Sequence, residues 1–144
     1  MIRKASSSEA GAVAALALKL WPEHELRELR LEFSQLLSGD SAAVFLCFRE
    51  GEAVGFAQCQ LRRDYVEGTE SSPVGYLEGI YVEPEFRGCG ISGQLLSACE
   101  NWARSMGCRE FASDCELDNR ASLIFHLRSG FREANRIVCF VKEL

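Results

Sequence analysis

The sequence contains no apolar run long enough to cross a membrane and no cluster of lysine or arginine residues. A membrane-spanning helix needs about 20 consecutive apolar residues, so we expect no membrane anchor. The net charge of −5 and the absence of a basic stripe argue against a nucleic-acid partner. Residues 1–8 are polar and basic, without the apolar segment of a signal peptide, which predicts a cytoplasmic protein.

The spacing of the histidines and cysteines predicts neither a metal site nor a disulfide framework. The two histidines, His24 and His126, do not stand at ligand spacing from any cysteine, so we predict no metal site. The cysteines are odd in number and form no C-x-x-C pair; they are Cys47, Cys59, Cys89, Cys99, Cys108, Cys115 and Cys139. Most lie within apolar runs, which predicts free thiols used as small buried side chains in a reducing compartment.

Ordinary proportions of apolar and charged residues over 144 positions predict a single domain spanning residues 1–144. Ser6 and Glu9 form a capping-box pattern at the start of a first helix, and Trp21-Pro22 ends that helix. The predicted elements of the first half are a strand over 2–5, helices ending near residues 20 and 37, and hairpin strands over 43–48 and 53–61.

The second half begins with a polar loop, residues 62–73, long enough to contact a substrate. A strand, a helix and a second strand then form a β–α–β unit, which places two parallel strands side by side. The predicted elements are strands over 74–82 and 108–114, helices over 91–106 and 119–129, and closing strands over 131–134 and 137–141. We therefore predict an α/β fold with a mixed sheet of about seven strands and about four helices.

The loop that joins strand 74–82 to helix 91–106 contains Arg87, Gly88, Cys89, Gly90, Ile91 and Ser92. A loop of this kind points unpaired backbone N–H groups at a helix N-terminus, where the helix dipole also favours negative charge. Glycine at 88 and 90 lets the backbone approach a ligand closely. The pattern predicts an anion site suited to a pyrophosphate. A turn between a strand and a helix whose glycines serve only packing would show the same sequence pattern.

This loop resembles the R-x-x-G-x-G/A segment of the GCN5-related N-acetyltransferase superfamily, with Ser92 where glycine or alanine is usual. The stretch from Asn119 to Phe131 resembles the superfamily's second cofactor segment, with Ser122 and His126 in place of alanine and tyrosine. The resemblance implies the acetyltransferase fold, with parallel strands 4 and 5 splayed apart, and acetyl-CoA as co-substrate. It also implies cofactor contacts from the loop residues, from Asn119, and from the strand backbone at Ile80, Tyr81 and Val82.

Glu78 interrupts the apolar strand 74–82, and simple alternation places it on one face with Tyr76, Ile80 and Val82. A charged carboxylate there is costly unless it is paired, so it either forms a salt bridge or binds and deprotonates an acceptor amine. Asp114 ends the neighbouring parallel strand, so the two carboxylates are predicted to face one cleft, unless Asp114 only caps a turn.

Several short segments between residues 20 and 114 are similar to the aminoglycoside 6′-N-acetyltransferases: Leu20-Trp21-Pro22, residues 63–66, 71–74 and 77–80, and Ala112-Ser113-Asp114. The similarity implies that Trp21, Tyr65, Glu78 and Asp114 line the acceptor site, with Glu78 as the catalytic acid–base group. It also places His126 where many relatives carry a tyrosine that protonates the departing thiolate. From the residues alone, Trp21 and His126 could equally be structural.

The sequence therefore predicts an acetyl-CoA-dependent transferase that acts on the 6′-amine of aminoglycosides by direct attack in a ternary complex. Two alternatives remain at this point: transfer to another amine, such as a polyamine, a metabolite or a protein N-terminus, or a CoA-binding module without turnover. Dimers are common among the relatives, and strand 137–141 could pair across subunits as an exposed edge.

Overall fold

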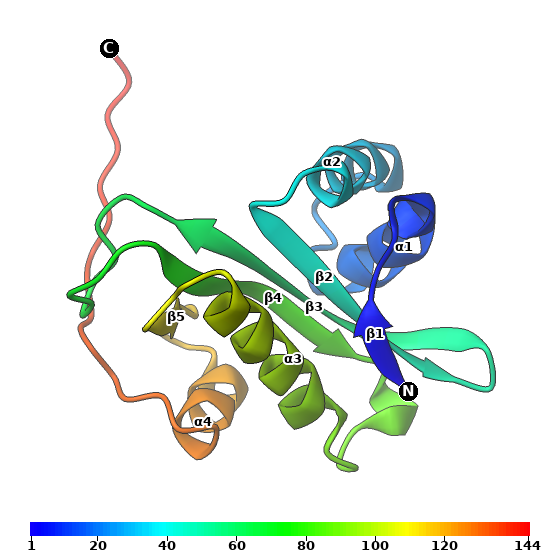
Figure 1. Cartoon of the computed structure of the whole chain (residues 1–144). Helices are drawn as coiled ribbons and strands as arrows, with labels where there is room; N and C mark the ends of the chain where they lie inside the picture. Colours follow the sequence, from blue (N-terminus) through cyan, green and yellow to red (C-terminus); the bar gives the residue numbers. More distant parts are fainter.

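The computed structural model describes all residues from Met1 to Leu144. The chain forms a central β-sheet with helices on both of its faces (Figure 1). A five-stranded sheet has the order β1-β2-β3-β4-β5; every neighbouring pair is antiparallel except β4 and β5, which run parallel. The strands are β1 (Ile2–Lys4), β2 (Ala42–Arg49), β3 (Glu52–Arg62), β4 (Val74–Val82) and β5 (Phe111–Ser113). The helices are α1 (Ala10–Leu20), α2 (Leu26–Ser38), α3 (Ile91–Ser105) and α4 (Arg120–Arg128), with short 3-10 turns η1 (Ser7–Glu9) and η2 (Pro84–Phe86).

Helices cover both faces of the sheet, and each face has its own apolar core (Figure 1). Alternation along β2 sends Val44 and Leu46 towards α1 and α2, and Ala43 and Cys47 towards α3. Four of the seven cysteines are buried, as their apolar surroundings predict: Cys47, Cys59, Cys99 and Cys108. No helix is long and apolar enough to traverse a bilayer.

The parallel strands β4 and β5 pair over only three residues. Their register joins Gly75 to Phe111, Tyr76 to Ala112 and Leu77 to Ser113, and β5 ends there. β4 continues to Val82 while the chain after β5 turns away into α4. The predicted splay between strands 4 and 5 is therefore present, and it begins at Leu77.

The sheet has five strands rather than the expected seven or so, because residues 131–134 and 137–141 form no strand. A strand needs a hydrogen-bonding neighbour, and beyond Phe131 no backbone group of the chain bonds to another backbone group. Side chains of this segment hydrogen-bond to the 67–68 loop, where Arg132 donates to the Gly68 carbonyl and Asn135 donates to the Glu67 carboxylate. The rest of the segment extends away from the body (Figure 1).

Candidate active site

A β-bulge in β4 determines where Glu78 points. Gln58 of β3 stands opposite Gly79, and the next residue, Cys59, stands opposite Leu77, so Glu78 is the extra residue. A bulge of this kind changes the phase of side-chain alternation along a strand. The expectation that Glu78 shares a face with Ile80 and Val82 is therefore wrong.

After the bulge, Ile80 and Val82 pack into the core beneath α3, whereas Glu78 lies on the opposite face with α1 and α2. Tyr76, which precedes the bulge, does share the Glu78 side, because the guanidinium of Arg62 contacts both residues. The side chain of Glu78 keeps only 19% of its surface exposed. Burial raises the pKa of the Glu78 carboxyl above its ordinary value, and the hydrogen bonds from Arg62 partly oppose this rise.

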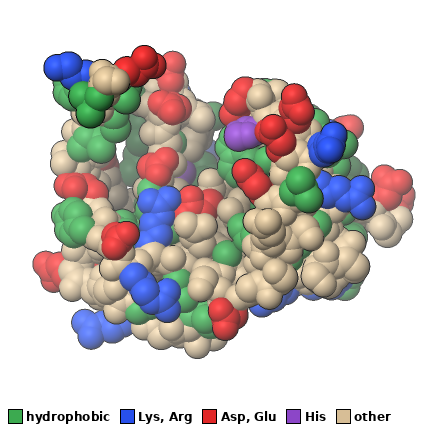
Figure 2. Space-filling view, turned by 90° about the horizontal axis from the view of Figure 1, so that it is seen from above, with side chains coloured by type: hydrophobic (Ala, Val, Ile, Leu, Met, Phe, Trp, Pro, Cys, Tyr) green, Lys and Arg blue, Asp and Glu red, His purple; other side chains and the backbone are tan.

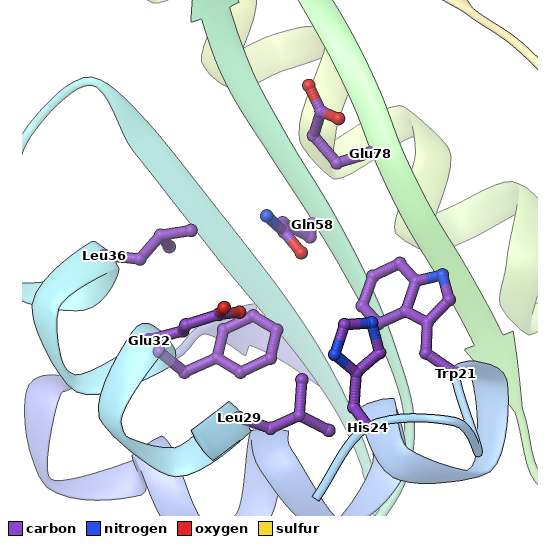
Figure 3. A pocket seen from close by; sticks show the side chains of 8 residues that line it. Trp21, His24, Leu29, Glu32, Leu36, Gln58 and Glu78 are labelled. Carbon is purple, nitrogen blue, oxygen red and sulfur yellow. The ribbon is translucent and has the colours of Figure 1, made fainter. Parts of the chain in front are cut away.

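Glu78 borders a pocket of about 220 Å³ between α2, the segment after α1, and the middle of β3 and β4 (Figure 3). Its walls combine apolar and polar side chains: Trp21, His24, Leu29, Glu32, Phe33, Leu36, Gln58 and Glu78. Figure 2, which looks down on Figure 1 from above, shows Asp and Glu side chains on both sides of a hollow in this surface. An apolar wall with acidic groups suits a cationic ring-shaped ligand.

Trp21 forms a wall of this pocket, and it is also held by the core. Its ring meets Phe56 edge to face at 6.2 Å between centroids. It also lies so close to β4 that a Cβ added at Gly79 would stand 2.6 Å from the indole. Glycine at 79 therefore permits the contact. Trp21 packs on the core and also borders the pocket, and its contact with an acceptor stays a prediction.

Asp114 follows β5 directly and accepts a hydrogen bond from the hydroxyl of Tyr76 on β4. The ring of the same tyrosine stacks on Arg62, which binds Glu78, so the two carboxylates are linked through Tyr76 and Arg62. Tyr65, in contrast, is 78% exposed on the 63–73 loop and does not line the pocket. Its contact with an acceptor stays a prediction.

The loop before α3 has the backbone geometry of an anion site. Gly88 and Gly90 adopt φ values of +81° and +84°, in the left-handed region that favours glycine. Helix α3 begins at Ile91, and Arg87 donates from Nε to the Val82 carbonyl at 2.7 Å. A Cβ at Gly88 would meet nothing within 4 Å, so the loop presents open backbone to a ligand. These features fit a pyrophosphate, with Cys89 exposed on the loop and Ser92 in the first turn of α3.

Between the loop and Glu78, the strand backbone at Ile80, Tyr81 and Val82 has no β5 partner because the pairing stops at Leu77. This free edge can accept an extended ligand by the hydrogen bonding that normally joins strands. The pyrophosphate-type loop, the free edge and Glu78 thus follow one another along a single strand and its loop.

His126 and Asn119 both belong to the α4 region. His126 Nδ1 lies 2.7 Å from the Ser122 carbonyl, and Nε2 lies 2.8 Å from the Ser113 hydroxyl. Since a carbonyl only accepts, Nδ1 carries a proton, and Nε2 faces the Ser113 hydroxyl. Asn119 caps α4, where its side-chain oxygen accepts from the Ser122 N–H at 3.1 Å. A CoA contact from Asn119 stays a prediction.

The sequence matches the acetyltransferase (GNAT) family over residues 11–131. The chain belongs to this family. The match includes the pocket, the free edge of β4, the glycine loop and all of α4.

Among curated GNAT proteins, the chain is 46% identical to an aminoglycoside N(6′)-acetyltransferase type 1 of Stenotrophomonas maltophilia, across 96% of this chain and 90% of that protein. Among solved structures, AAC(6′)-Iy in complex with the bisubstrate analogue CoA-S-monomethyl-acetylneamine superposes with a TM-score of 0.95 at 37% identity, covering 100% and 98% of the two chains. AAC(6′)-Ih from Acinetobacter baumannii gives 0.92 at 39% identity, with 100% and 98% coverage.

Sequence reasoning missed three polar residues of the pocket of this GNAT protein: His24, Glu32 and Gln58. Gln58 carried a usable signal, because it interrupts the apolar stretch from Ala53 to Cys59 of β3, as Glu78 interrupts β4. Glu32 and His24 carried none. Glutamate is common on helices, and only the packing of α2 against the sheet turns Glu32 towards the pocket (Figure 3).

The glycine loop gives the first testable prediction. Valine at Gly90 should lower the affinity for acetyl-CoA at least ~10-fold, because a β-branched residue disfavours a φ of +84° and adds bulk beside the backbone N–H groups. Titration calorimetry with CoA measures the change. Gly51→Val is the matched control, since Gly51 has a φ of +83° in the β2–β3 turn and nothing near its Cβ position.

The control should lose a similar amount of stability and keep its CoA affinity. Equal affinity of a folded Gly90→Val protein and the parent protein would contradict the role of the loop.

Proposed function

We propose that this protein transfers the acetyl group of acetyl-CoA to the 6′-amine of aminoglycosides. The observation that carries the proposal is the position of Glu78. A bulge turns this carboxylate into a pocket with an aromatic wall, one residue beyond the point where β4 and β5 part. The relatives with 37–46% identity over nearly the whole chain carry the name of this activity, which supports the choice of acceptor.

For the donor, the free edge of β4 and the glycine loop would hold acetyl-CoA, with Ile80, Tyr81 and Val82 along its arm and residues 87–92 at its pyrophosphate. The bound thioester supplies an activated acetyl group. Backbone N–H groups near Ile80 to Val82 would stabilise the oxyanion that develops on its carbonyl. Holding the amine and the thioester together accounts for much of the acceleration, and no covalent enzyme intermediate is needed.

For the acceptor, Glu78 and Asp114 provide negative charge, and Trp21 provides an apolar face for a sugar ring. Tyr65 would add a second aromatic contact from its exposed loop. An aminoglycoside has several ammonium groups on a rigid scaffold, so paired carboxylates beside an aromatic wall match its chemistry. Glu78 would accept the proton that the attacking amine loses, through a water molecule.

The function is tested by pairing aminoglycosides that carry either an amine or a hydroxyl at the 6′ position. We expect thiol release from acetyl-CoA with kanamycin A and none with the 6′-hydroxyl analogue, because the nucleophile is missing. Glu78→Gln should lower kcat at least ~100-fold and leave CoA affinity unchanged, since the variant keeps its size but cannot accept a proton.

Glu52→Gln, at an exposed position in the β2–β3 hairpin, is the matched control and should keep full activity. Acetylation of a polyamine or a peptide, with no turnover of any 6′-amino aminoglycoside, would retain the GNAT reaction and overturn the acceptor.

For His126 the geometry supports a structural role over that of a general acid, because both ring nitrogens already have partners within the protein. We expect His126→Phe to keep kcat within about threefold, because phenylalanine preserves the packing against Phe125 and Phe131. It should lose about 1–2 kcal/mol of unfolding free energy with the two hydrogen bonds. Steady-state kinetics and thermal unfolding measure both. A hundredfold loss of kcat in a stably folded variant would instead assign His126 to catalysis.

We also propose that the protein is a homodimer in which residues 137–141 of each copy pair with the sheet of the other. The segment has strand-forming residues, and its side chains are largely exposed in the single chain: Ile137 71%, Val138 77%, Phe140 92% and Val141 97%. Such a segment is costly to leave in water and has unpaired backbone groups that suit strand addition.

Light scattering after gel filtration should give a dimer mass for the parent protein and a monomer mass for Val138→Asp combined with Phe140→Asp. Leu31→Asp is the control, because Leu31 is an exposed apolar residue on α2, and it should remain dimeric. A monomeric parent protein at tens of micromolar would refute the proposal.

A further inference from the structure

Arg62, the last residue of β3, holds Glu78 with both arms of its guanidinium group. Nε and Nη2 donate to Glu78 Oε1 at 3.0 and 2.9 Å, and Nη2 also donates to Oε2 at 2.9 Å. Both carboxylate oxygens are therefore engaged. A two-oxygen contact of this kind fixes the plane and direction of a carboxylate as well as its charge.

The guanidinium of Arg62 also stacks on the ring of Tyr76. Its central carbon lies 3.4 Å from the centroid of the Tyr76 ring, a stacked arrangement that arginine forms and lysine does not reproduce. Tyr76 is buried between Val66 and Val74, so its position is fixed by the core. Arg62 is thus the link between a rigid aromatic ring and the carboxylate of Glu78.

The same tyrosine also holds the second carboxylate, because its hydroxyl donates to Asp114. Burial and this hydrogen bond raise the pKa of Tyr76, so the hydroxyl stays protonated and keeps donating. Asp114, Tyr76, Arg62 and Glu78 form one continuous chain of contacts, which we call the Arg62 chain. It contains two carboxylates and a single cation.

Other charged or titratable groups face Glu78 from the elements around it. Asp114 lies at the end of β5, and Glu32 of α2 and His24 after α1 lie across the pocket (Figure 3). Two of these three groups are acids, and Arg62 is the cation in hydrogen-bonding contact with Glu78. Without Arg62, a half-buried carboxylate would stand among acidic neighbours, which favours its protonated form.

We propose that Arg62 is a positioning residue that aims the Glu78 carboxylate at the acceptor amine and keeps it ionised before the acceptor binds. The proposal rests on the proposed function, because it assigns to Arg62 the preparation of the group that accepts the amine proton. Lysine cannot replace it fully, since lysine carries the charge but lacks the two-pronged contact and the stacking on Tyr76.

The experiment follows the side-chain carboxyl of Glu78 directly, by 13C NMR titration of the full-length protein without any ligand. The resonance is assigned with Glu78→Gln. In Arg62→Met we expect the midpoint of the Glu78 titration to move to higher pH by about one pH unit or more, since a nearby opposite charge commonly shifts a carboxyl by that amount. In Arg62→Lys the midpoint should move less.

Arg104→Met is the matched control, because Arg104 pairs with Glu100 on the outer part of α3, away from the pocket. It should leave the Glu78 midpoint unchanged. Thermal unfolding and CoA titration of each variant show whether it is folded. Since methionine removes packing on Tyr76 as well as charge, Arg62→Lys, which keeps the charge, provides the variant expected to fold if Arg62→Met does not.

Kinetics with kanamycin A then test the link to catalysis. We expect kcat of Arg62→Lys to fall about tenfold at neutral pH with KM for acetyl-CoA unchanged, and kcat of Arg104→Met to stay the same. An unmoved Glu78 midpoint in Arg62→Met, or full activity of Arg62→Lys, would overturn the proposal. A parent protein that shows the expected midpoints but acetylates no aminoglycoside would overturn the proposed function and leave the charge-holding role of Arg62 intact.

Discussion

The extra residue at position 78 determines which side chains of β4 face α1 and α2 and which face α3. Without the bulge, alternation would carry Glu78 into the apolar core under α3, together with Ile80 and Val82. An unpaired carboxylate there would be protonated or would destabilise the fold. The bulge turns it instead to the α1/α2 side, where Arg62 satisfies both of its oxygens. The chemistry of the site and the integrity of the α3 core therefore depend on the same local irregularity.

The parting of β4 from β5 supplies the second half of the site. Pairing that stops at Leu77 leaves the backbone from Glu78 to Val82 free on one edge, just where the carboxylate projects from the strand. The glycine loop and helix α3 follow at the end of the same strand. One strand therefore positions the free backbone edge, the glycine loop and the Glu78 carboxylate relative to one another.

Charge within the site is organised through Tyr76, a buried aromatic residue. Its ring supports the guanidinium that pairs with Glu78, and its hydroxyl binds Asp114. Two carboxylates on neighbouring strands are kept apart and oriented by one side chain whose own position is fixed by packing. This arrangement concentrates negative charge where a cationic acceptor would bind, in a protein whose overall charge is −5, without placing the two acids in direct contact.

By itself the sequence determined the order of the elements as far as α4, the glycine loop before α3, the family, and two residues of the pocket, Trp21 and Glu78. The elements, the loop and Glu78 follow from local signals: apolar periodicity, glycines that need a positive φ, and a charge within an apolar strand. The family and Trp21 follow from the resemblance of short motifs to known acetyltransferases. Only the tertiary structure decided the face that Glu78 occupies, because a bulge arises from pairing between strands and not from the strand's own residues. It also decided that residues 131–141 form no strand in the single chain, since β-forming side chains need a partner before they become a sheet. The contacts of Arg62 were likewise decided by the tertiary structure. In the sequence Arg62 is one of several arginines, and only folding brings its guanidinium between Tyr76 and Glu78.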